Sequence, residues 1–419
     1  MDDALIDTDS LSLERKSKLP GKGFFYPDSL DEDRQEERAK EALEGAEVVV
    51  ITDSDADGLG CVALIREAYD AALDVAPFEE RLRERLAGED DGDDATADDD
   101  AVDEGESTEA EEDEEFEESP VALLPSGPHS FEEDLEYAAE YLEPDADVFV
   151  CDIAPDAFEY VEEDLRTVVR RADEVRWFDH HQWDEELAES VRALGIDLVV
   201  GDSEEECSTD VTLRSLDYDF PERFAELAAV TRDHDLWLKA DERSDDVADY
   251  AYWTDAEEYA AVVGAYGVDL PPAVEEYITE RRVEKELLIE KAVGRADEHE
   301  VGDWSVGVTY GRCSQNEVAE TLRQQGMDAA VIVKPAGSVS VRGSEGFRRC
   351  HEVAGAVGGG GHPQAAGCKP DIYDDMLDYA HHWTTEGRAT KRVLLREFER
   401  LAEEEAEHRE AIDDGDAAE

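Results

Sequence analysis

Basic residues are scarce in this chain of 419 residues. Ten Lys and 29 Arg stand against 115 Asp and Glu, and the formal net charge is −76. The arginines are scattered, and the densest local pair lies in "EGFRRC" (345–350). Proteins that bind nucleic acid along a tract do so through many Lys and Arg contacts, which release counterions. We therefore exclude that mode of binding for this chain.

Long apolar runs and paired cysteines are also missing. No run approaches the ~18 apolar residues of a membrane span, and "MDDALIDTDS" at the start has no apolar core. We therefore expect neither a membrane span nor a signal peptide. The cysteines form no CxxC pair and no zinc spacing; they are Cys61, Cys151, Cys207, Cys313, Cys350 and Cys368. We expect reduced thiols in a cytoplasmic protein.

The acidic excess is spread over a chain that can still build ordinary cores. Its hydrophobic content is 41%. In molar salt the Debye length falls to about 3 Å, which screens the repulsion between surface carboxylates. The composition thus predicts a salt-adapted protein, from a haloarchaeon. It also means that a single Asp or Glu indicates little, and only a pattern of them is informative.

Composition shifts along the chain predict its domains. Residues 89 to 118 hold nineteen acids and no base, which is typical of a disordered insertion, placed at 87–119. The length suggests two or three domains. We predict an N-terminal arm (1–40), a first domain (41–270), a charged linker helix (271–297), a smaller second domain (298–390) and an acidic helical tail (391–419).

Short β-branched runs alternate with helical stretches, such as "FEEDLEYAAEYL" (131–142), in the first domain. The runs predict strands at 46–52, 121–125, 147–152, 175–179 and 196–202. This alternation indicates a parallel sheet with helices on both faces. The second domain predicts strands at 305–310, 329–335 and 338–343, a helix at 315–326, a glycine-rich loop and a final helical region at 371–405. The predicted fold class is α/β, with a helical linker joining the parallel-sheet domain to a smaller α/β domain.

Three of the predicted strands end in aspartate or histidine. In open parallel sheets, ligands bind beyond the carboxyl ends of the strands, so residues from different strands should meet there. The residues that follow the strands are Asp53, Asp55 and Asp57 in "ITDSDADGLG", Asp152, and Asp179, His180 and His181 in "DHH". Two adjacent histidines strengthen the pattern, because the chain has only ten.

Such a cluster predicts a cation site. Carboxylates packed together raise one another's pKa unless a cation neutralises them. Oxygen ligands with an imidazole suit Mn²⁺, with Mg²⁺ as the alternative. At least four carboxylates are available, which is enough for two ions bridged by one Asp. Gly58 and Gly60 would let the backbone pass close to the ions and start a helix toward a phosphate.

The ordered motifs resemble those of the DHH phosphoesterase superfamily. "DSDADG", the strand end at Asp152, "DHH" (179–181) and "TRDHDLW" (231–237) match its four motifs in order. "GGGGHPQAAG" (358–367), preceded by "SVSVRG", is similar to the signature of the DHH-associated C-terminal domain. RecJ-type nucleases and nano-RNase-like enzymes carry this arrangement. The resemblance covers roughly residues 45–85 and 120–370.

The resemblance implies a set of metal ligands and catalytic residues. The implied ligands are Asp53, Asp55, Asp57, Asp152, His180 and Asp233. Asp152 would bridge two ions, and Asp235 is the alternative to Asp233 in the fourth motif. His181 would contact phosphate or orient a ligand, and Asp179 would hold an imidazole. The implied catalytic residues are Asp152, His180 and His181.

The resemblance assigns substrate binding to the second domain. Backbone N–H groups of Gly359, Gly360 and Gly361, together with His362, would face an anion. Arg342 can make a bidentate contact to phosphate. In the first domain Trp183, just past the histidines, could either stack on a base or pack in the core.

The resemblance implies a metal-dependent phosphodiesterase. We expect a RecJ-like exonuclease that releases nucleotides from single-stranded DNA or RNA by two-metal hydrolysis. The alternative is hydrolysis of short oligonucleotides, cyclic dinucleotides or a nucleotide bisphosphate such as pAp. A scaffold in a replication or repair assembly, with such proteins as partners, is less favoured because every metal motif is filled. DNA or RNA preference, polarity and oligomeric state stay open.

Overall fold

The computed structural model describes residues 28–87, 119–127, 130–155, 157–311, 313–372 and 376–416. Nearly all of the predicted acidic insertion and most of the predicted N-terminal arm lie outside these residues. The described chain forms two compact units, the first ending at Ile278 and the second beginning at Thr279. The boundary falls within the helix α11 (Pro272–Gly294), where we predicted the linker helix.

The first unit is built on a five-stranded parallel sheet in the order β2-β1-β3-β4-β5. The strands are β1 (Val48–Asp53), β2 (Val121–Ser126), β3 (Asp147–Cys151), β4 (Val175–Asp179) and β5 (Asp197–Val200). Each lies within a residue or two of its predicted run. Alternate residues of β1 enter two different cores: Val48 and Val50 face one side, Val49 and Ile51 the other. The predicted doubly covered parallel sheet is therefore confirmed.

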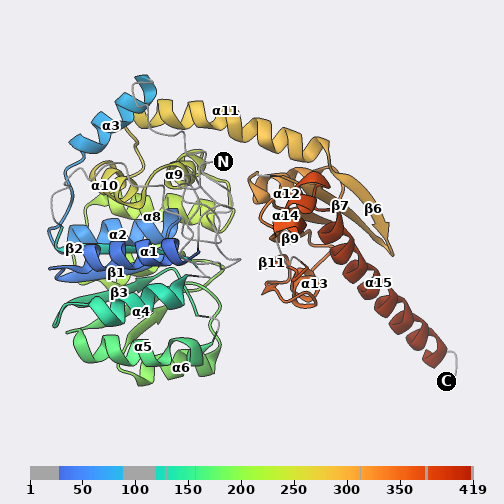
Figure 1. The fold of residues 1–419 in the computed structure, drawn as a ribbon, viewed down its shortest axis with the longest axis horizontal. Coiled ribbons are helices and arrows are strands. Elements are labelled where there is room, and N and C mark those ends of the chain that lie inside the picture. Colours follow the sequence, from blue (N-terminus) through green and yellow to red (C-terminus); the bar gives the residue numbers. More distant parts are fainter. Residues whose placement is uncertain are drawn as a thin grey trace, which may run out of the picture. The chain divides into compact units, whose positions relative to one another are not determined.

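Helices cover both faces of this sheet (Figure 1). One core includes residues of α2, α3 and α7 to α11, the other residues of α1 and α4 to α6. The helices are α1 (Asp28–Leu43), α2 (Ala56–Ala68), α3 (Ala76–Ala87), α4 (Phe131–Tyr141), α5 (Phe158–Arg171), α6 (Glu185–Ala193), α7 (Ser208–Ser215), α8 (Glu222–Asp235), α9 (Arg243–Trp253) and α10 (Ala256–Tyr266). Figure 1 shows α4 and α5 on one side of the sheet and α8 and α10 on the other.

The second unit has a six-stranded mixed sheet in the order β10-β11-β9-β8-β7-β6. Only β7 and β8 pair in parallel. The strands are β6 (Asp297–Val301), β7 (Trp304–Tyr310), β8 (Ala329–Val333), β9 (Val339–Gly343), β10 (Gly360–Gly361) and β11 (Ala365–Cys368). The helices are α12 (Gln315–Gln324), α13 (Cys350–Gly355), α14 (Met376–Thr384) and α15 (Arg388–Asp416). The smaller α/β unit is therefore as predicted, but the glycine-rich segment forms a short hairpin rather than a loop.

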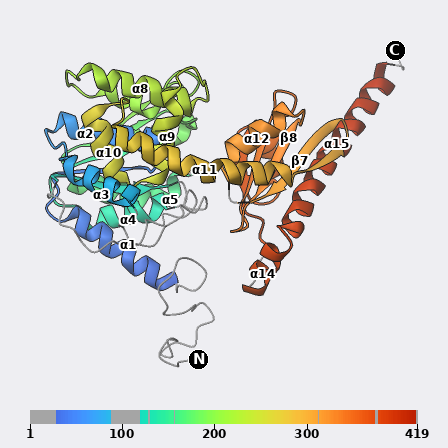
Figure 2. The ribbon, with the colours of Figure 1, turned by 90° about the horizontal axis from the view of Figure 1, so that it is seen from above.

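The predicted acidic tail is partly core structure. Leu394, Phe398 and Leu401 of α15 are buried in the main core of the second unit, because they recur at helical spacing on one face. Figure 2 shows α15 along this sheet. Likewise, Ala39 and Leu43 of α1, at the end of the predicted arm and just beyond it, are buried against the first sheet.

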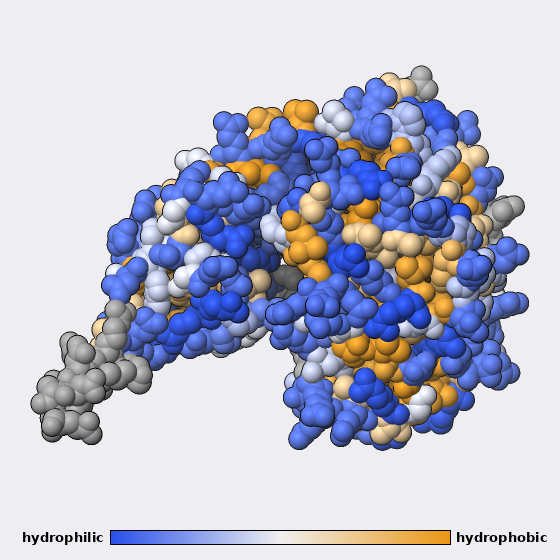
Figure 3. Space-filling view, turned by 180° about the vertical axis from the view of Figure 1, so that it is seen from behind, coloured by the Kyte–Doolittle hydropathy of each residue, from blue (hydrophilic) through white to orange (hydrophobic). Residues whose placement is uncertain are grey.

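The surface agrees with the composition. Hydrophilic residues predominate on the face drawn in Figure 3, and hydrophobic residues form scattered patches. All six cysteines lie within the described residues and are buried, and no disulfide joins any two of them. Among the described helices, none has the length and apolar character that crossing a membrane would need.

Candidate metal centre

The site is assembled at the carboxyl ends of β1, β3 and β4. These strands are neighbours in the sheet, because β3 pairs with β1 on one side and with β4 on the other. Their ends bring Asp53, Asp152 and Asp179 to one edge. The strand order 2-1-3-4-5 also has its topological switch point between β1 and β3, where open α/β sheets bind ligands. The predicted convergence of the strand ends is present.

Asp55 and Gly58 determine how α2 starts at this edge. Asp55 is the N-cap of α2, and its Oδ1 accepts hydrogen bonds from the backbone N–H groups of Asp57 (2.8 Å) and Gly58 (3.1 Å). A Cβ at Gly58 would lie 2.2 Å from the carbonyl oxygen of Asp53 and 2.5 Å from Thr52 Oγ1. Glycine is therefore required for α2 to begin so close to the end of β1.

Asp57 is buried and held by the N-terminus of α7. Its Oδ2 accepts from the N–H of Ser208 (2.6 Å), and its Oδ1 accepts from the N–H (2.8 Å) and Oγ1 (2.7 Å) of Thr209. Ser208 Oγ donates to Oδ1 of Asp152 at 2.9 Å. Neither Ser208 nor Thr209 belongs to the predicted site residues. The available signal was a Ser-Thr pair that opens a helix directly after the last strand of the sheet.

His180 lies in the middle of the carboxylates. Its Nε2 is 3.4 Å from Asp235 Oδ2, 3.7 Å from Asp152 Oδ1 and 3.9 Å from Asp57 Oδ2. Potential ligand atoms of Asp57, His180 and Asp235 lie within 4.8 Å of one another, as do those of Asp152, His180 and His181. His180 belongs to both groups, which suits two neighbouring ions.

Two buried atoms of this cluster have no hydrogen-bond partner among the described residues: His180 Nδ1 and Asp235 Oδ2. A buried polar atom without a partner is costly, and native proteins contain few of them. A cation bound by Asp235 would satisfy its carboxylate oxygen, and oxygen and imidazole donors suit Mn²⁺ or Mg²⁺. The side chains present therefore fit a divalent metal.

The electrostatics of the cluster also favour a cation. Burial is the main cause, and repulsion from Asp55 the second, that raises the pKa of Asp53 to about 8. The pKa of Asp235 is also raised to about 8, mainly by burial and then by repulsion from Asp57 and Asp55. Burial, together with repulsion from Asp57 and Asp55, also raises the pKa of Asp152. These carboxyls hold protons unless positive charge takes their place.

Asp179 connects His181 to Trp183. Its Oδ1 accepts from His181 Nδ1 at 2.7 Å, and its Oδ2 accepts from Trp183 Nε1 at 2.6 Å. Burial alone would raise the pKa of Asp179, but the hydrogen bonds from His181 and Trp183 lower it. Burial alone would lower the pKa of His181, but Asp179 raises it to about 9. Asp179 therefore holds an imidazole, as the resemblance implies. Trp183 is a hydrogen-bond donor whose ring also packs edge-on against Trp177.

Asp235, and not Asp233, lies in the cluster. The Asp233 carboxylate accepts hydrogen bonds from the N–H groups of Ala240 (2.9 Å) and Asp241 (3.2 Å) in the loop after α8. Burial alone would raise the pKa of Asp233, but these bonds and one with Ser244 lower it. The preference for Asp233 in the sequence analysis thus disagrees with the geometry. Residues two apart on a helix point about 200° apart, so only one of the pair can face the metal centre.

The predicted anion-binding residues of the second unit lie at its β10–β11 edge. Arg342 on β9 pairs with Ala365 on β11, and its guanidinium donates to Asn316 Oδ1 (2.9 Å) and to the Ala366 carbonyl (3.2 Å). Burial lowers the pKa of Arg342. His362 is exposed in the turn that follows β10.

Two glycines of this edge, Gly359 and Gly361, are required by close backbone approach. A Cβ at Gly359 would lie 2.1 Å from the carbonyl oxygen of Gly367, and Gly361 has φ +130°. A Cβ at Gly360 would meet nothing within 4 Å. The segment is therefore a narrow hairpin whose exposed face is bare backbone, which can approach an anion closely.

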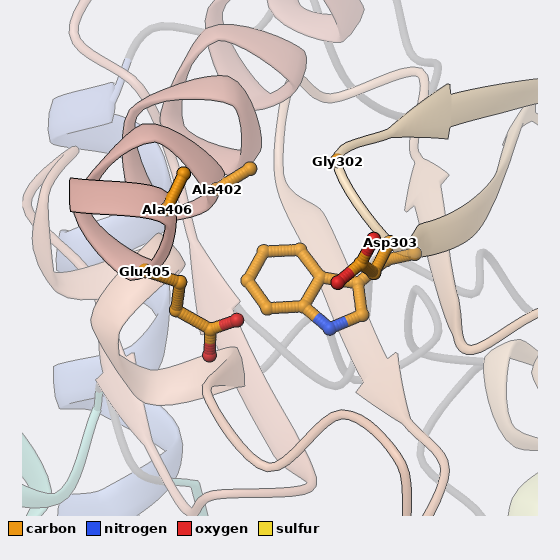
Figure 4. Close-up of a pocket in the computed structure, with 6 residues that line it drawn as sticks. Gly302, Asp303, Ala402, Glu405 and Ala406 are labelled. Atoms are coloured by element: carbon orange, nitrogen blue, oxygen red, sulfur yellow. The ribbon is translucent and has the colours of Figure 1, made fainter. Parts of the chain in front are cut away.

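A surface pocket of roughly 270 Å³ lies at the opposite, β6–β7 edge of this sheet (Figure 4). It is lined by Gly302, Asp303, Trp304, Ala402, Glu405 and Ala406. The two ionisable residues of the lining, Asp303 and Glu405, are both acidic, so the pocket repels phosphate. It plays no part in the predicted site.

No protein-family model and no curated protein matches the chain. Among solved structures, the chain is similar to exonuclease RecJ bound to manganese, with 16% identity over 94% of this chain and 96% of that chain and a TM-score of 0.47. It is similar to RecJ of Thermus thermophilus in complex with Mn²⁺, with 16% identity over 93% of this chain, 56% of that chain and a TM-score of 0.47. It is also similar to the DHH domain of a member of a family of ribosomal proteins, with 14% identity over 85% of this chain and 91% of that chain and a TM-score of 0.47.

At these identities and TM-scores the matches are likenesses of fold at most, and the chemistry of the site rests on this chain's own residues. The resemblance rests on three features: four ordered motifs, a 2-1-3-4-5 parallel sheet and a second unit with a glycine-rich edge. In these features the chain resembles the DHH phosphoesterase superfamily.

Proposed function

We propose that the chain is a Mn²⁺-dependent phosphodiesterase, a RecJ-like exonuclease that releases nucleotides from an end of single-stranded DNA or RNA. One observation carries the proposal. Asp235 Oδ2 is buried without a hydrogen-bond partner among the described residues and lies 3.4 Å from His180 Nε2, in a cluster with Asp57 and Asp152. A purely structural polar cluster would satisfy this oxygen internally.

The proposed ligands are Asp57, Asp152, His180 and Asp235, with Asp53 and Asp55 beside them. Asp152 belongs to one of the two groups that share His180 and would hold the metal together with it. When bound, two divalent ions at such a centre polarise a phosphoryl oxygen, generate hydroxide near neutral pH and stabilise the leaving oxygen. Asp57 and Asp152 contribute by holding fixed orientations, because Ser208 and Thr209 donate to them.

His181 is proposed to donate to a substrate phosphate. Its Nδ1 is engaged by Asp179, which leaves Nε2 free to face the substrate, and its side chain is partly exposed. Asp179 keeps the ring oriented, and Trp183 keeps Asp179 oriented. A positioned imidazole of this kind is a suitable donor to a phosphoryl oxygen. In the second unit, Arg342 and the backbone at Gly359–Gly361 and His362 are proposed to bind further phosphates.

The acidic composition limits how the substrate is held. A net charge of −76 repels a polyanion, except where bound cations and a few basic groups reverse the local field. We therefore propose that affinity depends on the metal and on a few phosphates near a chain end. This binding has a shallow salt slope, whereas a steep fall in single-strand affinity with rising salt would contradict it.

The test is direct hydrolysis by the full-length chain in multimolar KCl with Mn²⁺. Labelled single strands of graded length, cyclic dinucleotides and pAp are supplied in parallel, and the products are separated. Stepwise shortening of long strands supports the exonuclease. Turnover of only the shortest or cyclic substrates would replace it by the alternative activity. Equal turnover by Asp152→Asn would remove the metal mechanism.

A further inference from the structure

The start of α7 contacts the metal centre through donors that belong to none of the predicted motifs. Ser208 and Thr209 are fully buried. Together they supply three hydrogen bonds to the Asp57 carboxylate and one to Asp152. Their backbone N–H groups are also the first of α7, where the helix dipole favours negative charge.

We propose that Thr209 and Ser208 are positioning residues for the metal centre, which fix the carboxylates of Asp57 and Asp152 in the orientation that a metal requires. The inference rests on the proposed function, because it assumes that these carboxylates are ligands. A carboxylate has about four acceptor positions, so three bonds to Asp57 leave room for a cation. The Asp57 oxygen nearest to His180 Nε2 is Oδ2, at 3.9 Å.

The hydroxyl of Thr209 is specifically placed for this role. Its Oγ1 lies 2.7 Å from Asp57 Oδ1 and 2.9 Å from the Asp57 carbonyl oxygen. A Cβ at Gly60 would lie 2.5 Å from the same Oγ1. Gly60 therefore leaves the space on α2 that the Thr209 hydroxyl occupies, and the two residues form one arrangement. Asp57 is almost completely buried, so bulk water cannot readily replace the hydroxyl.

Ser208 performs the matching task for Asp152. Its Oγ donates to Asp152 Oδ1 at 2.9 Å, and this same oxygen is 3.7 Å from His180 Nε2. Asp152 has φ +54°, a strained conformation for a residue other than glycine, which persists only where the surroundings enforce it. The Ser208 hydroxyl is one such constraint on its side chain.

The test compares three substitutions at two threonines of α7 in the full-length protein. Thr209→Val removes the hydroxyl and keeps the shape, and Thr209→Ser restores the hydroxyl. Thr212→Val is the matched control, since Thr212 is equally buried in the same helix and its hydroxyl interacts with the Cys61 thiol rather than with the carboxylates of the cluster. Mn²⁺ binding is measured without substrate, from the electron paramagnetic resonance signal of free Mn²⁺, and thermal unfolding is followed alongside.

We expect Thr209→Val to weaken Mn²⁺ binding by about 10- to 100-fold, the usual cost of losing a residue that orients a metal ligand. Thr209→Ser should bind within a few-fold of the wild type, and Thr212→Val should bind like the wild type. Equal Mn²⁺ affinity in folded Thr209→Val and wild type would overturn the inference. An equal loss of affinity in Thr212→Val would also overturn it, because the effect would then be one of packing.

Ser208→Ala decides the matter if Thr209→Val does not fold. It removes only the hydroxyl that contacts Asp152, and it should weaken Mn²⁺ binding in the same direction; unchanged affinity would then overturn the inference. Failure of the proposed function gives a different result. In that case the wild-type protein itself binds no Mn²⁺, whereas failure of the positioning inference leaves wild-type binding intact.

Discussion

The two units of the chain carry opposite chemistry at the edges of their sheets. The first unit buries carboxylates and an imidazole at the end of a parallel sheet, where they need a cation to become attractive to phosphate. The second unit offers bare backbone at Gly359–Gly361 and one guanidinium, Arg342, at the edge of a mixed sheet. Under the proposed function, a protein with a net charge of −76 needs no basic surface to bind phosphate, because cations and backbone N–H groups supply the positive charge locally.

The largest expected effect separates Asp235 from Asp233 in the first unit. Asp235→Asn removes a charge from the cluster and should weaken Mn²⁺ binding by at least about 100-fold. Loss of a residue that only orients a metal ligand costs up to about 100-fold in affinity, and loss of a ligand itself should cost at least as much. Asp233→Asn instead alters a carboxylate that caps the loop after α8. It should lower thermal stability and leave Mn²⁺ affinity within a few-fold. Calorimetric titration of both variants checks the pair, and the reverse pattern would restore Asp233 as the ligand.

Arg342 tests the role of the second unit. Loss of a charge-assisted hydrogen bond to phosphate costs about 1.5–3 kcal/mol, so Arg342→Ala should raise KM by roughly 10- to 100-fold. Mn²⁺ affinity should not change, because Arg342 is no part of the metal centre. Arg348→Ala removes the same charge from an exposed position of the same unit and serves as the control. An unchanged KM in Arg342→Ala, or an equal rise in both variants, argues against phosphate binding by Arg342.

The glycine hairpin can be tested with two neighbouring glycines. Gly359→Ala places a Cβ against the backbone of Gly367 and Cys368, and overpacking of this kind costs about 1–3 kcal/mol of stability. Gly360→Ala meets open space and should leave the unfolding temperature within experimental error. Thermal unfolding of both variants is the measurement. Equal stability of the two would show that the hairpin does not have the close approach described.

A further prediction concerns the pH dependence of the metal-free protein. The pKa values of Asp53 and Asp235 are raised to about 8 and that of His181 to about 9. Between pH 6 and 8 the folded state therefore binds more protons than the unfolded state, and the free energy of unfolding should fall as pH rises. Mn²⁺ should reduce this slope, because the cations take the place of protons.

Denaturant unfolding at pH 6, 7 and 8, with Mn²⁺ or with a chelator, checks this prediction. The expected result is a chelated protein that loses stability from pH 6 to pH 8, and a Mn²⁺-bound protein that loses less. Stability that rises with pH in the chelated protein would contradict the raised pKa values of the cluster.

The sequence predicts the sheet and the edge at which its strand ends converge, and for a physical reason. Buried parallel strands appear as short β-branched runs, and the residues directly after them must lie at the same edge. The β-branched runs do not predict the order of the strands in the sheet, and hence the adjacency of β1, β3 and β4. This order is set by tertiary packing, and the only hint of it in the sequence was the order of the motifs.

Two features of the site could not be predicted with the same certainty. Asp233 and Asp235 both stand in "TRDHD", and only the rotation of α8 about its axis decides which of them faces His180. Ser208 and Thr209 carry no charge, and a Ser-Thr pair at a helix start is common as a cap. Their contact with Asp57 depends on the close approach of α2 and α7. Gly60 makes this approach possible, but a glycine at that position does not predict it.

The most direct measurement is anomalous diffraction at the manganese edge from crystals of the full-length protein soaked in Mn²⁺. We expect density for manganese within bonding distance of Asp57, Asp152, His180 and Asp235, with Asp233 still bound to the loop after α8. Absence of manganese from this edge of the sheet, or manganese bound through Asp233 with Asp235 turned away, would contradict the account.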